Sequence, residues 1–241
     1  MFSLLFPWSS SIGTGNARYV HRCGCAAESA SDVASSCPED LVARIAGILP
    51  NARLKKSLET RKLRRSVGID YGLERTGIAV TFCGLAPRPL SVSKLKGDNL
   101  IKKLLSVAKK EKADEFIVGL PRSWDAQETE QSNKTRTFAG RLAQYSAEEG
   151  VRVFLHDEYM TSEDALEFMI YRGSTKKSRR LEVDAYAAVI ILQTYFHNDG
   201  RFAQLMVPKR GELQEKLCSK YYQRLSQIEE DEDEDEDNEE L

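Results

Sequence analysis

The stretch SVGIDYGLERTGIAVTF, residues 66–82, contains two strand patterns separated by a short turn. Val67–Tyr71 predicts a β-strand, with the side chains of Val67 and Ile69 on one face. A glycine breaks this strand, and Gly77–Phe82 predicts a second one. The connection is so short that we expect the two strands to pair as an antiparallel hairpin.

Downstream of this hairpin, strand-like and helix-like patterns of apolar residues alternate along the chain. Strands show a period of two residues and amphipathic helices a period of 3.6. In chain order, we expect a strand at Leu90–Leu95, a helix at Asp98–Lys110, a strand at Glu115–Pro121, a helix at Thr129–Ala147 with Phe138, Leu142 and Tyr145 facing inward, a strand at Val151–Leu155, and helices at Thr161–Tyr171 and Leu181–Phe196. Three sequential strands followed by strand–helix–strand crossovers predict a mixed α/β sheet with helices on both faces.

The C-terminal part of the chain differs sharply in charge from the rest. The net charge of the 241 residues is −2, yet residues 229–240 read EEDEDEDEDNEE and contain 11 acids, so residues 1–228 carry a net charge of +9. A basic body is typical of proteins that bind nucleic acid, although an ordinary solvated surface has the same composition. We expect residues 198–228 to form a helical extension, with a helix near Glu212–Gln227, and residues 229–241 to form a disordered tail because like charges repel.

The first residues have the composition of an organelle transit peptide. Residues 1–27 contain no acid and include several serines together with Arg18 and Arg22. We expect residues 1–60 to hold a transit peptide and an extension, and the chloroplast stroma to be the destination rather than the mitochondrion. If this leader has no targeting role, the expected location is the cytoplasm. The five scattered cysteines fit a reducing compartment, and no apolar run is as long as a membrane span, so we expect no membrane partner.

Two acidic residues are unusual for the positions in which they stand. Asp70 stands at the end of the first strand, on the face opposite Val67 and Ile69, where a carboxylate is unfavourable unless it is solvated, hydrogen-bonded or bound to a cation. Asp184 interrupts the apolar segment LEVDAYAAVIIL, residues 181–192. A turn aspartate and a first-turn helix acid are the ordinary interpretations of these two positions.

A third acidic position closes the strand VRVFLHDE, residues 151–158. Asp157 and Glu158 are adjacent, so they lie on opposite faces of the strand and only one of them readily shares the face of Asp70. If three such acids converge, their oxygens select hard cations such as Mg²⁺ or Mn²⁺. Two such ions can hold the attacking water and the leaving oxygen of a phosphodiester.

Four motifs in order resemble the YqgF/RuvX family of ribonuclease H-like proteins, over Val67 to Phe196. The motifs are DYGLERTGIAV, with Asp70, Gly72, Arg75, Gly77 and Ala79 at the family positions; IVGLPRSWDAQETEQS, with Gly119, Leu120, Pro121, Asp125 and Glu128; HDEYMTSEDA; and KKSRRLEVDAYAAVIILQTYF. Two positions depart from the family pattern, with Tyr159 in place of the usual Arg and Ala126 in place of the usual Gly. The resemblance implies that residues 66–197 form a ribonuclease H-like domain.

The resemblance also implies a function. The family is linked to nuclease action in maturing the 5′ end of small-subunit ribosomal RNA precursors, and some members have been proposed to resolve Holliday junctions. Its metal-binding, catalytic acids match Asp70, Glu158 and Asp184, which implies Mg²⁺ or Mn²⁺ as the cofactor. We therefore expect a nuclease whose partners are precursor ribosomal RNA and ribosomal particles. A DNA junction resolvase and a non-catalytic RNA-binding assembly factor are the alternatives.

Basic residues near these acids are candidates for contacts with the phosphate backbone. They are Arg75, Arg122, Lys176, Lys177, Arg179 and Arg180. The third acid is less firmly assigned than the other two. The strand of Glu158 is the fifth in the sequence, whereas a ribonuclease H-like sheet places the fourth strand next to that of Asp70. Asp157, Asp125 and Glu128 therefore remain alternatives for the role of Glu158.

Overall fold

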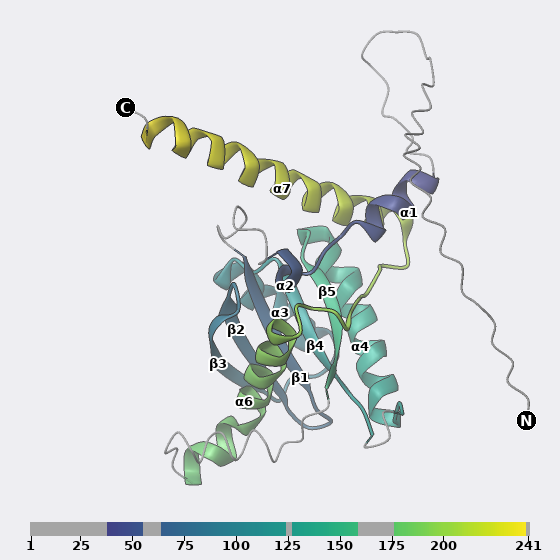
Figure 1. Cartoon of the computed structure of the whole chain (residues 1–241). Coiled ribbons are helices and arrows are strands. Elements are labelled where there is room, and N and C mark those ends of the chain that lie inside the picture. The colour runs from purple at the N-terminus through teal and green to yellow at the C-terminus, as the bar shows by residue number, and fades with distance from the viewer. Residues whose placement is uncertain (1–37, 55–63, 124–126, 159–175, 240–241) are drawn as a thin grey trace, which may run out of the picture. The chain divides into compact units, whose positions relative to one another are not determined.

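The computed structural model describes residues 38–54, 64–123, 127–158 and 176–239, of which Pro38, Glu39, Glu158 and residues 176–181 and 227–239 are described by their backbone alone (Figure 1). The described residues belong to one unit. Its elements are α1 (Pro38–Ala46), α2 (Asn51–Leu54), β1 (Arg65–Tyr71), β2 (Thr76–Phe82), β3 (Leu85–Ser93), α3 (Gly97–Glu111), β4 (Glu115–Pro121), α4 (Glu130–Ser146), η2 (Ala147–Glu149), β5 (Arg152–Glu158), α6 (Lys176–His197), β6 (Ala203–Leu205) and α7 (Gly211–Glu239).

The strands form one mixed sheet in the order β3-β2-β1-β4-β5-β6. β1 pairs antiparallel with β2, as does β2 with β3, whereas β1, β4 and β5 run parallel. The predicted ribonuclease H-like mixed sheet is thereby confirmed. The sequence did not indicate β6, which pairs antiparallel with β5. Its three residues are too few to show a period of two. The helix expected at Thr161–Tyr171 lies outside the described residues.

The two faces of the sheet are covered by different helices. On β1, Val67 and Ile69 pack into an apolar core with residues of α3 and α4. The opposite face packs against α6, which lies across the strands in Figure 1. Tyr145 of α4, which we expected to face the core, is 47% exposed. The smaller Ala143 and Ser146 are buried at that turn of the helix instead.

A buried ionic network joins the beginnings of β4 and β5. Arg152 is 1% exposed, and its Nη2 lies 2.5 Å from Asp114 Oδ2 and 3.7 Å from Glu115 Oε2. Glu115 is fully buried and accepts hydrogen bonds from Ser66, from Tyr195 and from a backbone N–H of α2. Burial raises the pKa of Glu115, while the charge of Arg152 opposes that rise. Removing one partner from such a buried pair typically destabilises a protein by about 3–5 kcal/mol.

The C-terminal helix extends farther than the sequence suggested. We expected a helix near Glu212–Gln227 followed by a disordered tail, but the backbone of α7 stays helical through the acidic segment to Glu239. Glutamate is a good helix former, and extending an existing helix requires no new nucleus. Near its start, α7 packs against α1, and Tyr222 Oη donates a hydrogen bond to the carbonyl of Arg44. No helix within the described part of the chain is long and apolar enough to cross a membrane.

Candidate active site

The structure brings Asp70 and Asp184 together on the α6 side of the sheet. Val67 and Ile69 face the core under α3 and α4, so the alternation of β1 places Asp70 on the opposite face. α6 supplies Asp184. Burial, and then repulsion from the charge of Asp184, raises the pKa of Asp70 to about 7. The two carboxyl groups are therefore close enough to interact electrostatically, although they are 114 positions apart in the sequence.

Gly77 allows this approach. It is the cross-strand partner of Asp70 in the β1–β2 pair. A Cβ atom at Gly77 would lie 1.8 Å from the carbonyl oxygen of Asp184 and 2.8 Å from the amide nitrogen of Ala185. The backbone of α6 therefore rests directly on β2 beside Asp70. The sequence signal for such a close approach is a glycine within a strand, but that signal does not say which segment approaches.

Arg75 was expected to contact nucleic acid, and the structure pairs it with Asp184. The Nε atom of Arg75 lies 2.9 Å from Asp184 Oδ2, and its Nη2 donates to Oδ1 at 3.5 Å. The Arg75 side chain is 37% exposed, and that of Asp184 is 21% exposed. The charge of this guanidinium thus offsets part of the negative charge of Asp184.

Glu158 ends β5, and only its backbone is described. β4 lies between β1 and β5, so these two strands are about 10 Å apart. Ile69 pairs with Val118, and Val118 pairs with Leu155. Residue 156 of β5 is therefore level with Asp70 of β1. Position 158 lies at the same edge of the sheet, two residues farther along β5. Its assignment as the third carboxylate stays a prediction.

Two of the alternatives to Glu158 belong to a separate cluster of ion pairs. Nη2 of Arg122 lies 2.9 Å from Asp157 Oδ1, and its Nη1 lies 3.1 Å from Glu128 Oε1. Arg136 also binds Glu128. Arg122, which we expected to contact nucleic acid, is thus matched by two carboxylates and is only 17% exposed. The remaining alternative, Asp125, lies outside the described residues.

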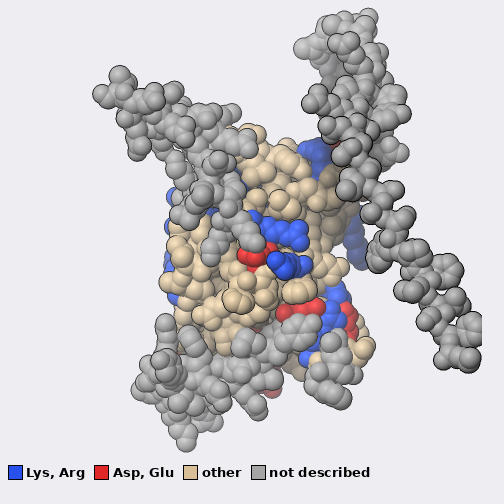
Figure 2. Space-filling view, viewed as in Figure 1, with Lys and Arg blue, Asp and Glu red and all other residues tan. Residues whose placement is uncertain are grey.

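The basic run before Asp184 is helical. We expected the last helix to begin at Leu181, but α6 begins at Lys176, because lysine and arginine are good helix formers. Lys176, Lys177, Arg179 and Arg180 therefore lie in its first turns. Their side chains are not described, and their contact with nucleic acid stays a prediction. Figure 2 shows basic side chains beside acidic ones near the middle and the lower right of the face in view, and others without an acidic neighbour at its margins.

The donor chemistry of Asp70 and Asp184 fits a divalent cation. Among the described side chains, no three His, Cys, Asp or Glu residues lie close enough to form a metal site. The side chain of Glu158 is not among those described. Two neighbouring carboxylates repel each other, and their oxygens are the ligands that Mg²⁺ and Mn²⁺ prefer. His156 is 1% exposed, and burial lowers its pKa to about 4, so it is a neutral, buried side chain in this region.

Comparison with known proteins identifies a family. The model for the family described as "RuvX: Holliday junction resolvase" matches residues 64–198, which is more than half of the chain. Curated relatives, including those from Porphyromonas gingivalis and Shewanella oneidensis, carry the name "Putative pre-16S rRNA nuclease". The one from Porphyromonas gingivalis is 36% identical over 139 residues, covering 57% of this chain and 99% of the relative. The one from Shewanella oneidensis is 32% identical over 134 residues, covering 55% and 93%.

Among solved structures, the chain is similar to RuvC from T. thermophilus in complex with a Holliday junction substrate. The sequence identity is 21% and the TM-score is 0.41, with 59% of this chain and 99% of the RuvC chain covered.

Proposed function

The chain belongs to the RuvX family, and from that membership we propose that it is a metal-dependent nuclease that matures the 5′ end of small-subunit ribosomal RNA precursors. The observation that carries the proposal is the pairing of Asp70 with Asp184 at one edge of the sheet, where burial and mutual repulsion raise the pKa of Asp70 to about 7. The names of the curated relatives support the RNA substrate.

In the proposed mechanism, Asp70, Asp184 and Glu158 would hold Mg²⁺ or Mn²⁺. When bound, such an ion lowers the pKa of water and stabilises charge on the phosphoryl oxygens. The chain's own side chains position the substrate. Arg75 lies beside Asp184 with a side chain that is 37% exposed, and we propose that it orients a phosphate group next to the acids. The basic residues in the first turns of α6 supply further charge for the nucleic-acid backbone.

The proposed setting is an organelle, with the chloroplast stroma favoured and a ribosomal particle as a partner. The support for this setting is the acid-free stretch at residues 1–27, which has the composition of a transit peptide. A full-length protein with a C-terminal fluorescent tag should therefore accumulate in chloroplasts. Retention of that protein in the cytosol would contradict the organelle setting and leave the nuclease proposal intact.

The substrate is tested by a competition assay with the purified full chain. We expect cleavage within the leader of a 5′-labelled small-subunit rRNA precursor in Mg²⁺ or Mn²⁺, and no cleavage in EDTA. An unlabelled four-way DNA junction at equal concentration should compete poorly. A protein carrying Asp184→Asn, purified in the same way, controls for contaminating nucleases.

Two other outcomes would replace the proposal. Preferential cleavage of the four-way junction would favour a junction resolvase, the second candidate, which the description of the matched family supports. RNA binding without cleavage in either metal would indicate a non-catalytic assembly factor.

A further inference from the structure

The solvent-facing side of α3 is a row of lysines. The buried residues of this helix pack into the core under the sheet, and they are Leu100, Ile101, Leu104 and Ala108. At 3.6 residues per turn, the opposite side of the helix contains four lysines, which are Lys102, Lys103, Lys109 and Lys110. We call these four residues the α3 lysine face. Three of them are exposed, and Lys103 is half-buried.

The positive charge of the α3 lysine face is not balanced by acids of the described residues. α3 itself contains two acids, and both are paired with arginines of other elements. Asp98 Oδ1 lies 2.7 Å from Arg141 Nη2, and Glu111 Oε2 lies 2.9 Å from Arg88 Nη2. None of the four lysines forms an ion pair with a described carboxylate. Their ammonium groups are therefore available to a negatively charged partner.

α3 begins beside the proposed nuclease site. Lys96, the residue before α3, donates a hydrogen bond from Nζ to the carbonyl of Gly72 at 2.9 Å. Gly72 directly follows β1 and stands two residues after Asp70. α3 ends at Glu111, shortly before β4 begins, and β4 runs parallel to β1. The helix therefore extends for about 22 Å, from the end of the sheet that carries Asp70 to the opposite end.

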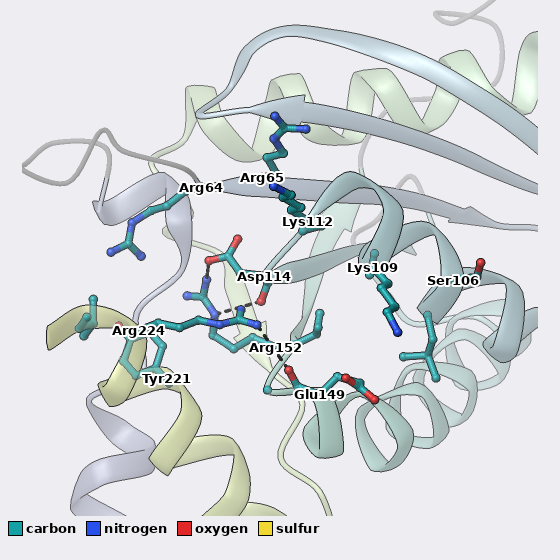
Figure 3. Close-up of a pocket in the computed structure, with 16 residues that line it drawn as sticks. Arg64, Arg65, Ser106, Lys109, Lys112, Asp114, Glu149, Arg152, Tyr221 and Arg224 are labelled. Atoms are coloured by element: carbon teal, nitrogen blue, oxygen red, sulfur yellow. Dashed lines mark hydrogen bonds and ion pairs between the residues drawn. The ribbon is translucent and has the colours of Figure 1, made fainter. Parts of the chain in front are cut away.

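Exposed cations continue where α3 ends. Figure 3 shows Lys109 and Lys112 beside a cavity at the beginnings of the parallel strands, and Arg224 of α7 also lines that cavity. All three side chains are exposed, and the exposed acid among the lining residues is Glu149. The rim of the cavity therefore extends the positive surface of α3 towards α7.

We propose that the α3 lysine face binds the phosphate backbone of an RNA strand whose neighbouring segment lies in the nuclease site. The proposal rests on the proposed function, which supplies RNA as the substrate. A row of exposed cations without acidic partners suits a polymer that carries a regular series of negative charges. At about 3.4 Å per nucleotide of a stacked strand, the length of α3 corresponds to about six nucleotides. The face would therefore hold a segment of the substrate several nucleotides away from the cleaved bond.

The test is fluorescence anisotropy of a labelled, unstructured RNA strand of about 20 nucleotides, titrated with the full chain in EDTA at several KCl concentrations. EDTA prevents metal-dependent cleavage, so binding is measured independently of nuclease activity. The variant Lys102→Gln/Lys109→Gln/Lys110→Gln should weaken binding about tenfold or more at about 100 mM KCl. The plot of log Kd against log [KCl] should become less steep by about 2, because each phosphate contact of a single strand contributes about 0.7 to the slope.

A charge-matched variant controls for the change in net charge. Arg201→Gln/Lys209→Gln/Arg210→Gln removes three exposed cations that lie on either side of β6 in the sequence. It should keep the salt dependence of the parent. Asp70→Asn should keep it as well, because this substitution alters the nuclease site and not α3. Glutamine is a good helix former, so the α3 variant should have a Tm close to that of the parent.

Three outcomes would overturn the proposal. One is an equal salt dependence of the α3 variant and the charge-matched variant, and another is the absence of salt-dependent RNA binding by the parent. The third is parent-like RNA binding by an α3 variant that no longer binds polyglutamate, which would assign the face to an acidic protein. If the parent binds RNA through these lysines but does not cleave it in Mg²⁺ or Mn²⁺, the nuclease proposal fails and the role of the α3 lysine face stands.

Discussion

Asp70→Asn is expected to abolish metal-dependent cleavage and, with metal chelated, to raise the free energy of unfolding at pH 8. The carboxylate is one of the two neighbouring groups that we propose hold a divalent cation. Losing such a ligand removes several kcal/mol of transition-state stabilisation, which corresponds to more than about a thousandfold in rate. Cleavage of the precursor RNA in Mg²⁺ measures the first effect, and urea unfolding in EDTA measures the second.

The gain in stability follows from the pKa of Asp70, which burial and then the charge of Asp184 raise from 3.8 to about 7. A carboxyl group with a raised pKa contributes stability that is fully present below its ordinary pKa and is lost as the pH rises through about 7. The parent should therefore lose stability relative to Asp70→Asn between about pH 4 and pH 8. At pH 8 we expect the variant to be more stable by about 2–4 kcal/mol.

Glu74→Gln is the matched control, because Glu74 is an exposed acid on the turn between β1 and β2. It should leave cleavage and the pH dependence of unfolding unchanged. Adding Mn²⁺ at pH 8 should raise the Tm of the parent and of Glu74→Gln, but not that of Asp70→Asn. If Asp70→Asn cleaves like the parent, Asp70 is not part of the catalytic machinery. If it is no more stable than the parent at pH 8, the two carboxylates do not repel each other as described.

Gly77→Ala is expected to destabilise the fold and disable the site together. The new Cβ would lie 1.8 Å from the carbonyl oxygen of Asp184 and 2.2 Å from its carbonyl carbon, and both are backbone atoms of α6 that no rotamer change can move aside. The helix must shift away from β2. We expect the free energy of unfolding to fall by about 3 kcal/mol. Cleavage should fall about a hundredfold or more, because a displacement of about 1 Å separates Asp184 from Asp70.

Gly211→Ala is the matched control, since a Cβ at Gly211 meets no atom within 4 Å. It should unfold and cleave like the parent. Urea unfolding separates the stability effect from the activity effect, because the cleavage assay is run where both proteins are fully folded. Parent-like stability of Gly77→Ala would show that α6 does not rest on β2 as the structure describes.

The sequence alone predicted the elements that arise from local patterns. The period of two in residues 66–82 predicted the β1–β2 hairpin, and the residue patterns farther along the chain predicted α3, β4 and α4 close to their observed bounds. Asp70 was recognisable because it is a carboxylate at the end of a strand, on the face opposite Val67 and Ile69. Asp184 was recognisable because it interrupts an apolar helix. Side-chain periodicity is a local property, so it can be read without knowing what packs against it.

The tertiary structure alone decided which side chains meet. Arg75 and Asp184 are 109 residues apart and form an ion pair that the sequence did not indicate. Arg122, the residue after the end of β4, likewise pairs with Asp157 of β5. Such contacts depend on strand register and on how closely a helix approaches the sheet, which no local pattern encodes.

The pairing of Asp70 with Asp184 depends on both the local sequence pattern and the tertiary structure. Local pattern marked each acid as unusual, but only the absence of a side chain at Gly77, opposite Asp70 in the hairpin, lets the backbone of α6 come close enough to place Asp184 there.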